Sequence, residues 1–396
     1  MSVRNFKRLC TYLLLIFVAC IMLLLLFNNY PVVVSSTESY LKDRERLIEA
    51  ERKLRFGHDV DLTSDEMKAN ECLMRAKTEE IDNELQLSDI PRTFYRRRIS
   101  NFKKIKLFRV YQILRKMPKG GLFHAHGLSI LSIDKVLEYT RLPNLYVCVS
   151  GDRLRFRFSR SRPASDDRCR AWASMEEQRR KNPNLDEKLK RKLRLDPATT
   201  TSPEVGHVEL TTIYEKFMCE ALQELHDDNI MFLELRNALI PLYDFEGTTY
   251  TREDTVRTLL KVVKCYALIK HSKLMEVVKK KIVVEVSPIS NQVLKLVADM
   301  RNHPAAHFFA MNLPVVMTSD DQALWGASGL SYDFYEAFVG IMSSEADLRA
   351  LKQLALNSIK NGSLNEQERT RAFEIFNREW IKFVVELTNS SLCADE

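Results

Sequence analysis

The sequence predicts an α/β protein in which buried strands alternate with helices, as in a (β/α) barrel or a doubly wound sheet. Four apolar segments end in polar residues and are followed by helical patterns, at 122–127, 230–236, 282–286 and 314–317. The 396 residues are 45% hydrophobic, which allows a sizeable core. An eight-stranded barrel needs twice as many strands, so the predicted barrel is incomplete, with about four strands missing.

The first 36 residues are typical of a targeting segment. Three basic residues precede an uncharged apolar run at 9–27, as in a signal peptide or, as the second choice, a signal anchor. A buried core helix is the remaining alternative. Either targeting signal sends the rest of the chain to the lumen or the outside of the cell. Two glycosylation sequons, at Asn361 and Asn389, agree with this route.

Helices are expected ahead of the first strand. Thr63 and Glu66 form a capping box, which predicts the start of a helix. Residues 99–117 carry apolar side chains at helical spacing, and a Pro-Lys-Gly-Gly sequence then ends that helix. Later helical patterns cover 210–228, 252–270, 332–342, 345–359 and 365–387.

A basic segment interrupts the alternation at 145–205, and we interpret it as an inserted subdomain. Between Arg153 and Arg194 there are 15 basic and 6 acidic residues, a local net charge of 15 − 6 = +9. The whole chain has +7, so the rest of it sums to 7 − 9 = −2 and the basicity belongs to this segment. Such a distribution argues against nucleic-acid binding as the main function. Six of the eight cysteines lie outside the targeting segment, and we expect Cys148 and Cys169 to pair first in an oxidising compartment.

The arginines of this segment allow two interpretations. They alternate with apolar residues, so they could form a solvated face opposite a buried one. They could instead bind sulfated glycans or acidic cell-surface partners. The residues concerned are Arg153, Arg155, Arg157, Arg160 and Arg162.

Two motifs could carry chemistry. His124 and His126 are two residues apart on a predicted strand, so both imidazoles share a face and could bind one metal ion. Asp320 and Asp321 follow another strand and could supply one metal ligand and one group that binds substrate. Ordinary polar histidines and a helix N-cap are the alternatives for these two motifs.

Three segments resemble the adenosine deaminase-related growth factors, the extracellular type-two adenosine deaminases. They are MPKGGLFHAHG at 117–127, EVSPISNQVLKLVADMRNHP at 285–304 and TSDDQALWGASGLSYDFYEAF at 318–338. The resemblance implies a zinc-dependent (β/α)₈ barrel of the metal-dependent hydrolase type at 117–396. It also implies an N-terminal helical region at 37–116 that forms a homodimer, and a receptor-binding insert at 145–205 held by a disulfide.

The same resemblance assigns roles to residues. His124, His126 and Asp320 would bind Zn²⁺, Asp321 would contact the purine N7, and Glu234 would lie on the ribose side. The implied reaction converts adenosine or deoxyadenosine and water to the inosine product and ammonia, with zinc activating the water. The resemblance also implies a growth-factor role, through removal of extracellular adenosine.

This sequence departs from the family at two positions. Similar proteins carry HAGE, with a third zinc histidine and the catalytic glutamate, and then GHG; both motifs are absent here. We therefore predict an internal deletion between about Lys264 and Ala267, and the catalytic acid is unknown. His271, near this junction, matches a family position that binds no metal. Gly127 stands where similar proteins have an acidic residue that contacts the ribose.

Two hypotheses follow. The first is an exported zinc adenosine deaminase whose activity is impaired. Barrel closure couples strand number, tilt and shear, so we expect the deletion to separate Asp320 from the two histidines. The second is a non-catalytic secreted dimer that binds a receptor or a glycan through its basic insert.

Expression in insect cells tests the targeting segment. We expect a product in the secretory pathway or the medium whose mobility shifts after glycosidase treatment, because the chain carries two sequons. A wholly cytosolic, unglycosylated product would contradict this expectation.

Overall fold

A computed structural model describes residues 37–87, 105–150, 153–167, 169–194, 213–237, 239–265 and 283–394. The chain divides into two compact units, Met1–Lys53 and Leu54–Glu396. The described part of the first unit contains helix α2, Thr37–Arg52. The apolar run at 9–27 and the predicted junction near 266 lie outside the described residues. None of the described helices is long and apolar enough to cross a membrane.

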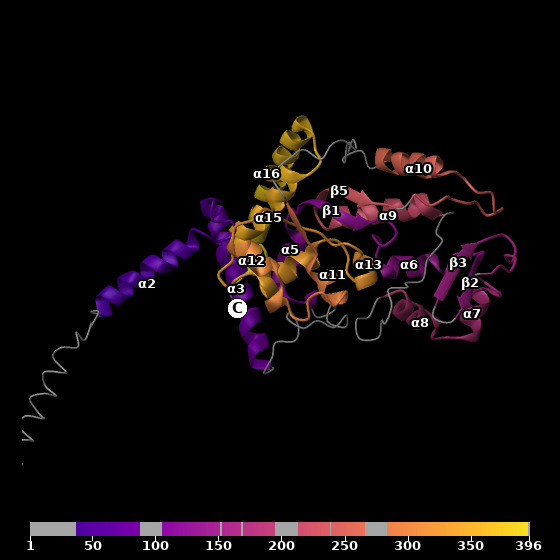
Figure 1. The fold of residues 1–396 in the computed structure, drawn as a ribbon, viewed down its shortest axis with the longest axis horizontal. Coiled ribbons are helices and arrows are strands. Elements are labelled where there is room, and N and C mark those ends of the chain that lie inside the picture. The colour runs from indigo at the N-terminus through magenta and orange to yellow at the C-terminus, as the bar shows by residue number, and fades with distance from the viewer. Residues whose placement is uncertain are drawn as a thin grey trace, which may run out of the picture. The chain divides into compact units, whose positions relative to one another are not determined.

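The four predicted body strands form two parallel pairs in the second unit. Strand β1 (Gly120–His126) pairs with β5 (Ile230–Arg236), and β6 (Val284–Val286) pairs with β7 (Val315–Met317). Figure 1 shows β1 and β5 side by side.

A backbone bridge joins the two pairs. Ala125 of β1 forms a parallel bridge with Asp320, which lies just after β7. The lateral order is therefore β5, β1, β7, β6. In a closed eight-stranded barrel the first strand lies between the second and the last. The four strands thus correspond to the second, first, eighth and seventh strands of such a barrel, and the fold is the predicted incomplete barrel.

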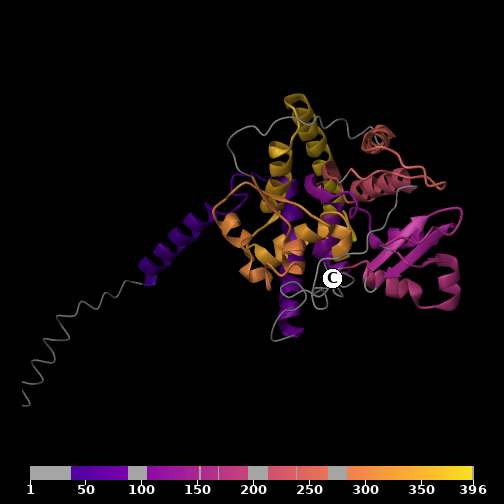
Figure 2. The same cartoon turned by 45° about the vertical axis from the view of Figure 1, so that its right-hand side comes forward.

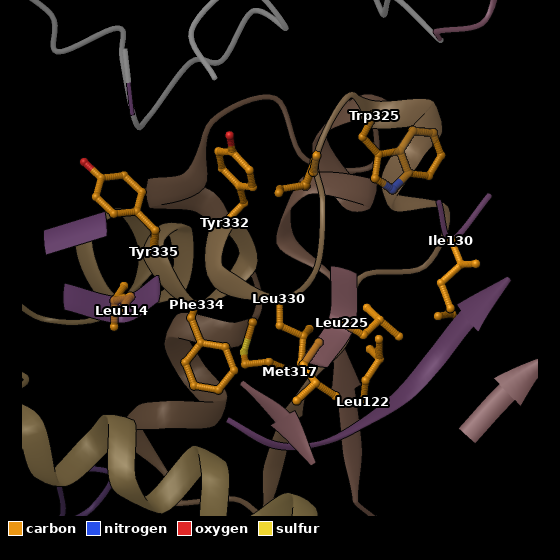
Figure 3. Close-up of a cluster of buried hydrophobic side chains, with 14 of the residues drawn as sticks. Leu114, Leu122, Ile130, Leu225, Met317, Trp325, Leu330, Tyr332, Phe334 and Tyr335 are labelled. Carbon is orange, nitrogen blue, oxygen red and sulfur yellow. The ribbon is translucent and has the colours of Figure 1, made fainter. Parts of the chain in front are cut away.

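Helix α15 (Leu348–Asn361) packs across both pairs of strands. The Ser358 hydroxyl accepts a hydrogen bond from the backbone N–H of Gly121 in β1, at 2.7 Å. The side-chain amide of Asn357 donates to the carbonyl of Val315 in β7, at 2.9 Å. Leu122 of β1 and Met317 of β7 belong to the same cluster of buried side chains (Figure 3). Side chains and one helix therefore hold the half-barrel together.

The expected helices are present where the structure describes them, although some boundaries differ. The helix expected at 99–117 is interrupted at 106–108 and continues as α5 (Arg109–Lys116), while residues 99–104 lie outside the described residues. The predicted helix at 332–342 divides into a short α-helix and a π-helix, and the one expected from 345 begins at Leu348. The remaining helices of the body are α5 (Arg109–Lys116), α6 (Ile133–Tyr139), α9 (Tyr214–Asp227), α10 (Arg252–Cys265), α11 (Pro288–Val293), η3 (Met300–Asn302), α12 (Ala305–Ala310), α13 (Gln322–Trp325), α14 (Ser331–Tyr335), the π-helix η4 (Glu336–Ile341), α16 (Glu366–Thr388) and η5 (Ser391–Cys393).

Within the second unit, helix α3 (Ser64–Leu87) packs against the C-terminal helices α15 and α16. Its capping box is confirmed: Thr63 N–H donates to the Glu66 carboxylate at 2.8 Å, and Glu66 N–H donates to the Thr63 hydroxyl at 3.3 Å. The buried Glu66 carboxylate also binds Lys352 of α15 and the indole N–H of Trp380 in α16, the latter at 2.6 Å.

A disulfide between Cys72 and Cys393 adds a covalent link between α3 and η5. This disulfide was not predicted from the sequence, because the two cysteines are 321 residues apart and no local motif pairs them.

The basic insert forms a small subdomain of its own. Strands β2 (Leu145–Ser150), β3 (Arg153–Phe158) and β4 (Trp172–Ser174) form an antiparallel sheet in the order β3-β2-β4, accompanied by α7 (Met175–Lys181) and α8 (Leu185–Lys192) (Figure 2). Cys148 and Cys169 form the expected disulfide, with Trp172 packed beside it.

Several arginines of the insert have partners within the chain. Arg155 lies 3.5 Å from Asp166, and Arg160 lies 2.7 Å from Glu246. The guanidinium of Arg157 lies over the ring of Tyr243. The intervening Leu154, Phe156 and Phe158 are buried. These contacts fit a half-solvated strand with paired charges, and binding of a glycan or receptor by this face stays a prediction.

The environment of Glu66 predicts acid sensitivity. Burial acts to raise the pKa of the Glu66 carboxyl, but hydrogen bonds from Lys352, Thr63 and Trp380 outweigh it and hold the pKa below its ordinary value of 4.5. A lowered folded-state pKa gives stability that is present above about pH 4.5 and is lost as the pH falls through the folded-state pKa. Glu66→Gln should lower the free energy of unfolding at pH 7 by about 1.5–3 kcal/mol.

Urea unfolding at pH 7 and at pH 3–4 checks this effect, and the loss caused by Glu66→Gln should shrink at the lower pH. Glu379→Gln is the control, because Glu379 pairs with Arg378 on the exposed surface of α16. Equal losses for the two variants at pH 7 would refute the role of Glu66.

Candidate metal centre

Three side chains converge at the carboxyl ends of β1 and β7. His124, His126 and Asp320 each offer one ligand atom, and these atoms lie within 4.8 Å of one another. The Nε2 atoms of the two histidines are 3.1 Å apart. Asp320 Oδ1 lies 3.5 Å from His126 Nδ1 and 3.9 Å from His124 Nε2. All three residues are partly exposed to solvent.

The β1–β7 bridge places Asp320 beside the histidines. Asp320 N–H donates to the carbonyl of His124 at 2.9 Å, and His126 N–H donates to the carbonyl of Asp320 at 3.3 Å. Asp320 adopts a left-handed backbone conformation, with φ of 54°, which aspartate tolerates better than most residues. Ser290 donates to Asp320 Oδ2 at 2.7 Å and fixes the carboxylate.

Our expectation that the missing strands separate Asp320 from the histidines is therefore wrong for this structure. In a closed barrel the position of each strand depends on all the others. The retained strands are neighbours, however, and the contact that carries Asp320 is local to β1 and β7. Strands lost from the opposite side remove none of these hydrogen bonds.

Each histidine also meets a carboxylate through its Nδ1 atom. His124 Nδ1 lies 3.1 Å from Glu285 Oε2, and His126 Nδ1 lies 2.9 Å from Asp321 Oδ1. Asp321 Oδ1 accepts a further, short hydrogen bond from the hydroxyl of Ser129. A carboxylate on one ring nitrogen fixes the tautomer and leaves the other nitrogen free for a metal.

Glu285 is a site residue that sequence analysis missed, although it begins one of the motifs that carried the family resemblance. It lies in the middle of β6, and its Oε1 is 3.7 Å from Arg236 at the end of β5. Its position could have been predicted, because a charged residue within a short apolar strand is unusual and needs a partner.

Glu234 lies away from this cluster. Its Oε1 accepts hydrogen bonds from the backbone N–H and the hydroxyl of Ser363, at 2.7 and 2.8 Å. Ser363 belongs to the Asn361 sequon between α15 and α16. In this conformation Glu234 fastens that turn, and its contact with ribose stays a prediction.

Gly127 has little room for a larger residue. A Cβ atom at this position would lie 2.2 Å from the side-chain oxygen of Asn237, whose amide donates to the Tyr214 hydroxyl. An acidic residue here would require Asn237 to move. His271 lies outside the described residues.

The Met-Pro-Lys-Gly part of the first motif is structural. Lys119 is fully buried at the start of β1, and its ammonium donates to the carbonyls of Met117 and Asp228, at 3.1 and 2.7 Å. Burial lowers the pKa of Lys119 to about 8, against the opposing effect of the Asp228 carboxylate. The motif therefore anchors the strand that carries the histidines.

The comparisons with known proteins agree with this geometry. Residues 19–114 match the family model described as adenosine/AMP deaminase N-terminal, and residues 263–377 match the model described as adenosine deaminase. The chain is 28% identical to an adenosine deaminase of Lutzomyia longipalpis, over 96% of this chain and 99% of that protein. It is 27% identical to adenosine deaminase 2 of Homo sapiens, over 87% of this chain and 93% of that protein.

Fold and site together define a metal-dependent hydrolase of the barrel type. The chain belongs to the adenosine deaminase family, whose members are hydrolases that act on adenosine.

The alignment with the Lutzomyia protein also shows how much of that protein has no counterpart here. The alignment is 513 residues long, but 96% of this chain is only about 380 residues. About 130 residues of the relative, from 513 − 380, are therefore unmatched in this chain. That length fits the loss of about four strands and their helices.

Proposed function

We propose that this chain binds Zn²⁺ through His124, His126 and Asp320 and acts on adenosine as a slow deaminase. The observation that carries the proposal is the 4.8 Å cluster of ligand atoms at the carboxyl ends of two adjacent strands. In barrel enzymes this is the end at which active sites lie.

The donor set fits zinc. Two imidazole nitrogens and a carboxylate oxygen are common zinc ligands, and a catalytic site normally has three protein ligands and one open position. When bound, Zn²⁺ supplies Lewis-acid activation of water for attack at C6 of the purine.

The chain's own residues hold the reacting groups. Ser290 holds the Asp320 carboxylate, and each imidazole has a carboxylate oxygen beside its Nδ1 atom. Asp321 Oδ1 is occupied by His126 and Ser129, which leaves Oδ2 for the purine N7. Because N7 and a carboxylate oxygen are both acceptors, this contact requires a proton on Asp321.

Slow turnover follows from the missing acid. Deamination requires a proton on the ring nitrogen as ammonia leaves, and no HAGE glutamate is present to donate it. Glu234 is engaged with Ser363, and Glu285 is engaged with His124 and Arg236. Neither carboxylate is free to replace the glutamate in this conformation.

The location and partners of the chain form part of the proposal. We infer a secreted protein, supported by the targeting segment, the two disulfides and the sequons at Asn361 and Asn389. The region at 37–116 would form the homodimer, and the insert at 145–205 would contact a cell-surface receptor or sulfated glycan. Removal of extracellular adenosine would give a growth-factor role.

The alternative function is a non-catalytic secreted binding protein. It is favoured by one observation: the insert has its own sheet, buried apolar side chains and disulfide, all of which are independent of the missing strands. Such a protein would bind its partner equally well after loss of the metal ligands.

Asp320→Asn tests the metal site. The change removes the negative charge from the cluster but keeps a side chain of the same shape. We expect zinc affinity, measured by competition with a chromogenic chelator, to fall by more than about 100-fold. This exceeds the loss of about 10–100-fold that follows removal of a group that only supports a ligand. Asp59→Asn, at an exposed aspartate outside the cluster, should leave the affinity unchanged. Unchanged affinity in Asp320→Asn would remove Asp320 from the ligand set.

A side-by-side assay tests the deaminase. One protein is this chain, and the other has the missing segment restored, with its HAGE and GHG motifs; zinc is supplied to both. Inosine release by this chain should be slower by a factor of about 10²–10⁴, the usual contribution of a general acid. Release within tenfold of the restored protein would mean that another group donates the proton.

A further inference from the structure

We propose that Glu285 is a positioning residue of the metal centre: it accepts a hydrogen bond from His124 Nδ1–H and so directs His124 Nε2 at the ion. This inference rests on the proposed function, because it assumes that the three-residue cluster binds zinc. The contact that carries it is the 3.1 Å distance between His124 Nδ1 and Glu285 Oε2.

The direction of this hydrogen bond follows from chemistry. An ionised carboxylate can only accept, so the ring nitrogen that faces Glu285 must carry the hydrogen. A neutral imidazole then has its lone pair on Nε2, which is the atom that faces His126 Nε2 at 3.1 Å. His126 has the same arrangement, because its Nδ1 faces Asp321 Oδ1, and this oxygen accepts a hydrogen bond even when Oδ2 carries a proton. Both Nε2 atoms are thus available at one point, as a shared ion requires.

Glu285 is itself held in place. Its strand is paired with β7, with hydrogen bonds from Val284 N–H to the carbonyl of Pro314 at 3.0 Å and from Thr318 N–H to the carbonyl of Val286 at 2.9 Å. Its second oxygen lies 3.7 Å from Arg236, so the two ends of the carboxylate have different partners. Glu285 therefore couples β6 to the histidine on β1.

The geometry favours a supporting role over direct ligation. Glu285 is not among the three residues whose ligand atoms lie within 4.8 Å of one another, and it contacts the site through His124. Support of this kind matters more here than in a complete site. Because the chain has no HAGE histidine, His124 is one of only two proposed nitrogen ligands. If its imidazole is turned away from the ion, no third histidine of that motif can take its place.

The test measures zinc affinity and histidine tautomers in the full chain. The variants are Glu285→Ala, which removes the acceptor, and Glu285→Gln, which keeps a neutral one. Glu246→Gln is the control, because Glu246 pairs with Arg160 in the insert. Circular dichroism and thermal unfolding of the metal-free proteins check that each variant folds.

Glu285→Ala should weaken zinc binding by about 10–100-fold, the usual effect of losing the partner of a ligating histidine, and Glu285→Gln should weaken it less. In ¹⁵N spectra of the metal-free protein, His124 should carry its proton on Nδ1 in the wild type and shift toward Nε2 in Glu285→Ala. Zinc affinity within twofold of wild type, with an unchanged tautomer, would overturn the proposal.

Two further outcomes separate this inference from the proposed function. If the wild-type chain binds zinc no better than Asp320→Asn, the metal centre itself fails. If the wild type binds zinc and Asp320→Asn does not, but Glu285→Ala binds normally, only the role of Glu285 fails. If Glu285→Ala does not fold, the Glu285→Gln variant decides, and wild-type affinity in that variant overturns the proposal.

Discussion

The backbone contact between β1 and the end of β7 is the constraint on which the rest of the site depends. Two hydrogen bonds between Asp320 and the flanking peptide groups of His124 and His126 bring three ligands together from segments almost 200 residues apart. In a closed barrel these strands are the first and the last, so they are neighbours whatever happens on the far side. Strands on the far side of the barrel can therefore be absent while this edge stays intact.

The sequence predicted the local features well. Strands β1 and β5 were found within two residues of their apolar runs, and the Thr63–Glu66 capping box formed as its spacing predicted. These features depend on nearest neighbours along the chain. The Cys72–Cys393 link and the Glu285–His124 contact depend instead on how distant segments pack, and no local pattern reports such pairs.

The predicted separation of Asp320 from the two histidines was wrong for a physical reason. Strand number does not control every contact in the barrel, because helix α15 forms hydrogen bonds with both strand pairs through Ser358 and Asn357. The site consequently keeps a sensible ligand set while lacking the acid that the reaction requires. The three candidate ligands lie on β1 and after β7, whereas the HAGE glutamate belongs to a strand that has no counterpart in this chain. The proposed metal centre and slow turnover are therefore compatible in one chain.

X-ray absorption at the zinc edge of the metal-loaded chain tests the central claim most directly, because it counts the ligands around the ion. The account predicts two imidazole nitrogens at about 2.0–2.1 Å, together with carboxylate or water oxygens at about 2.0–2.2 Å. One of the two imidazole contributions should disappear in His126→Ala. A zinc environment with no imidazole, or one that is unchanged in His126→Ala, would show that the cluster of His124, His126 and Asp320 is not the metal centre.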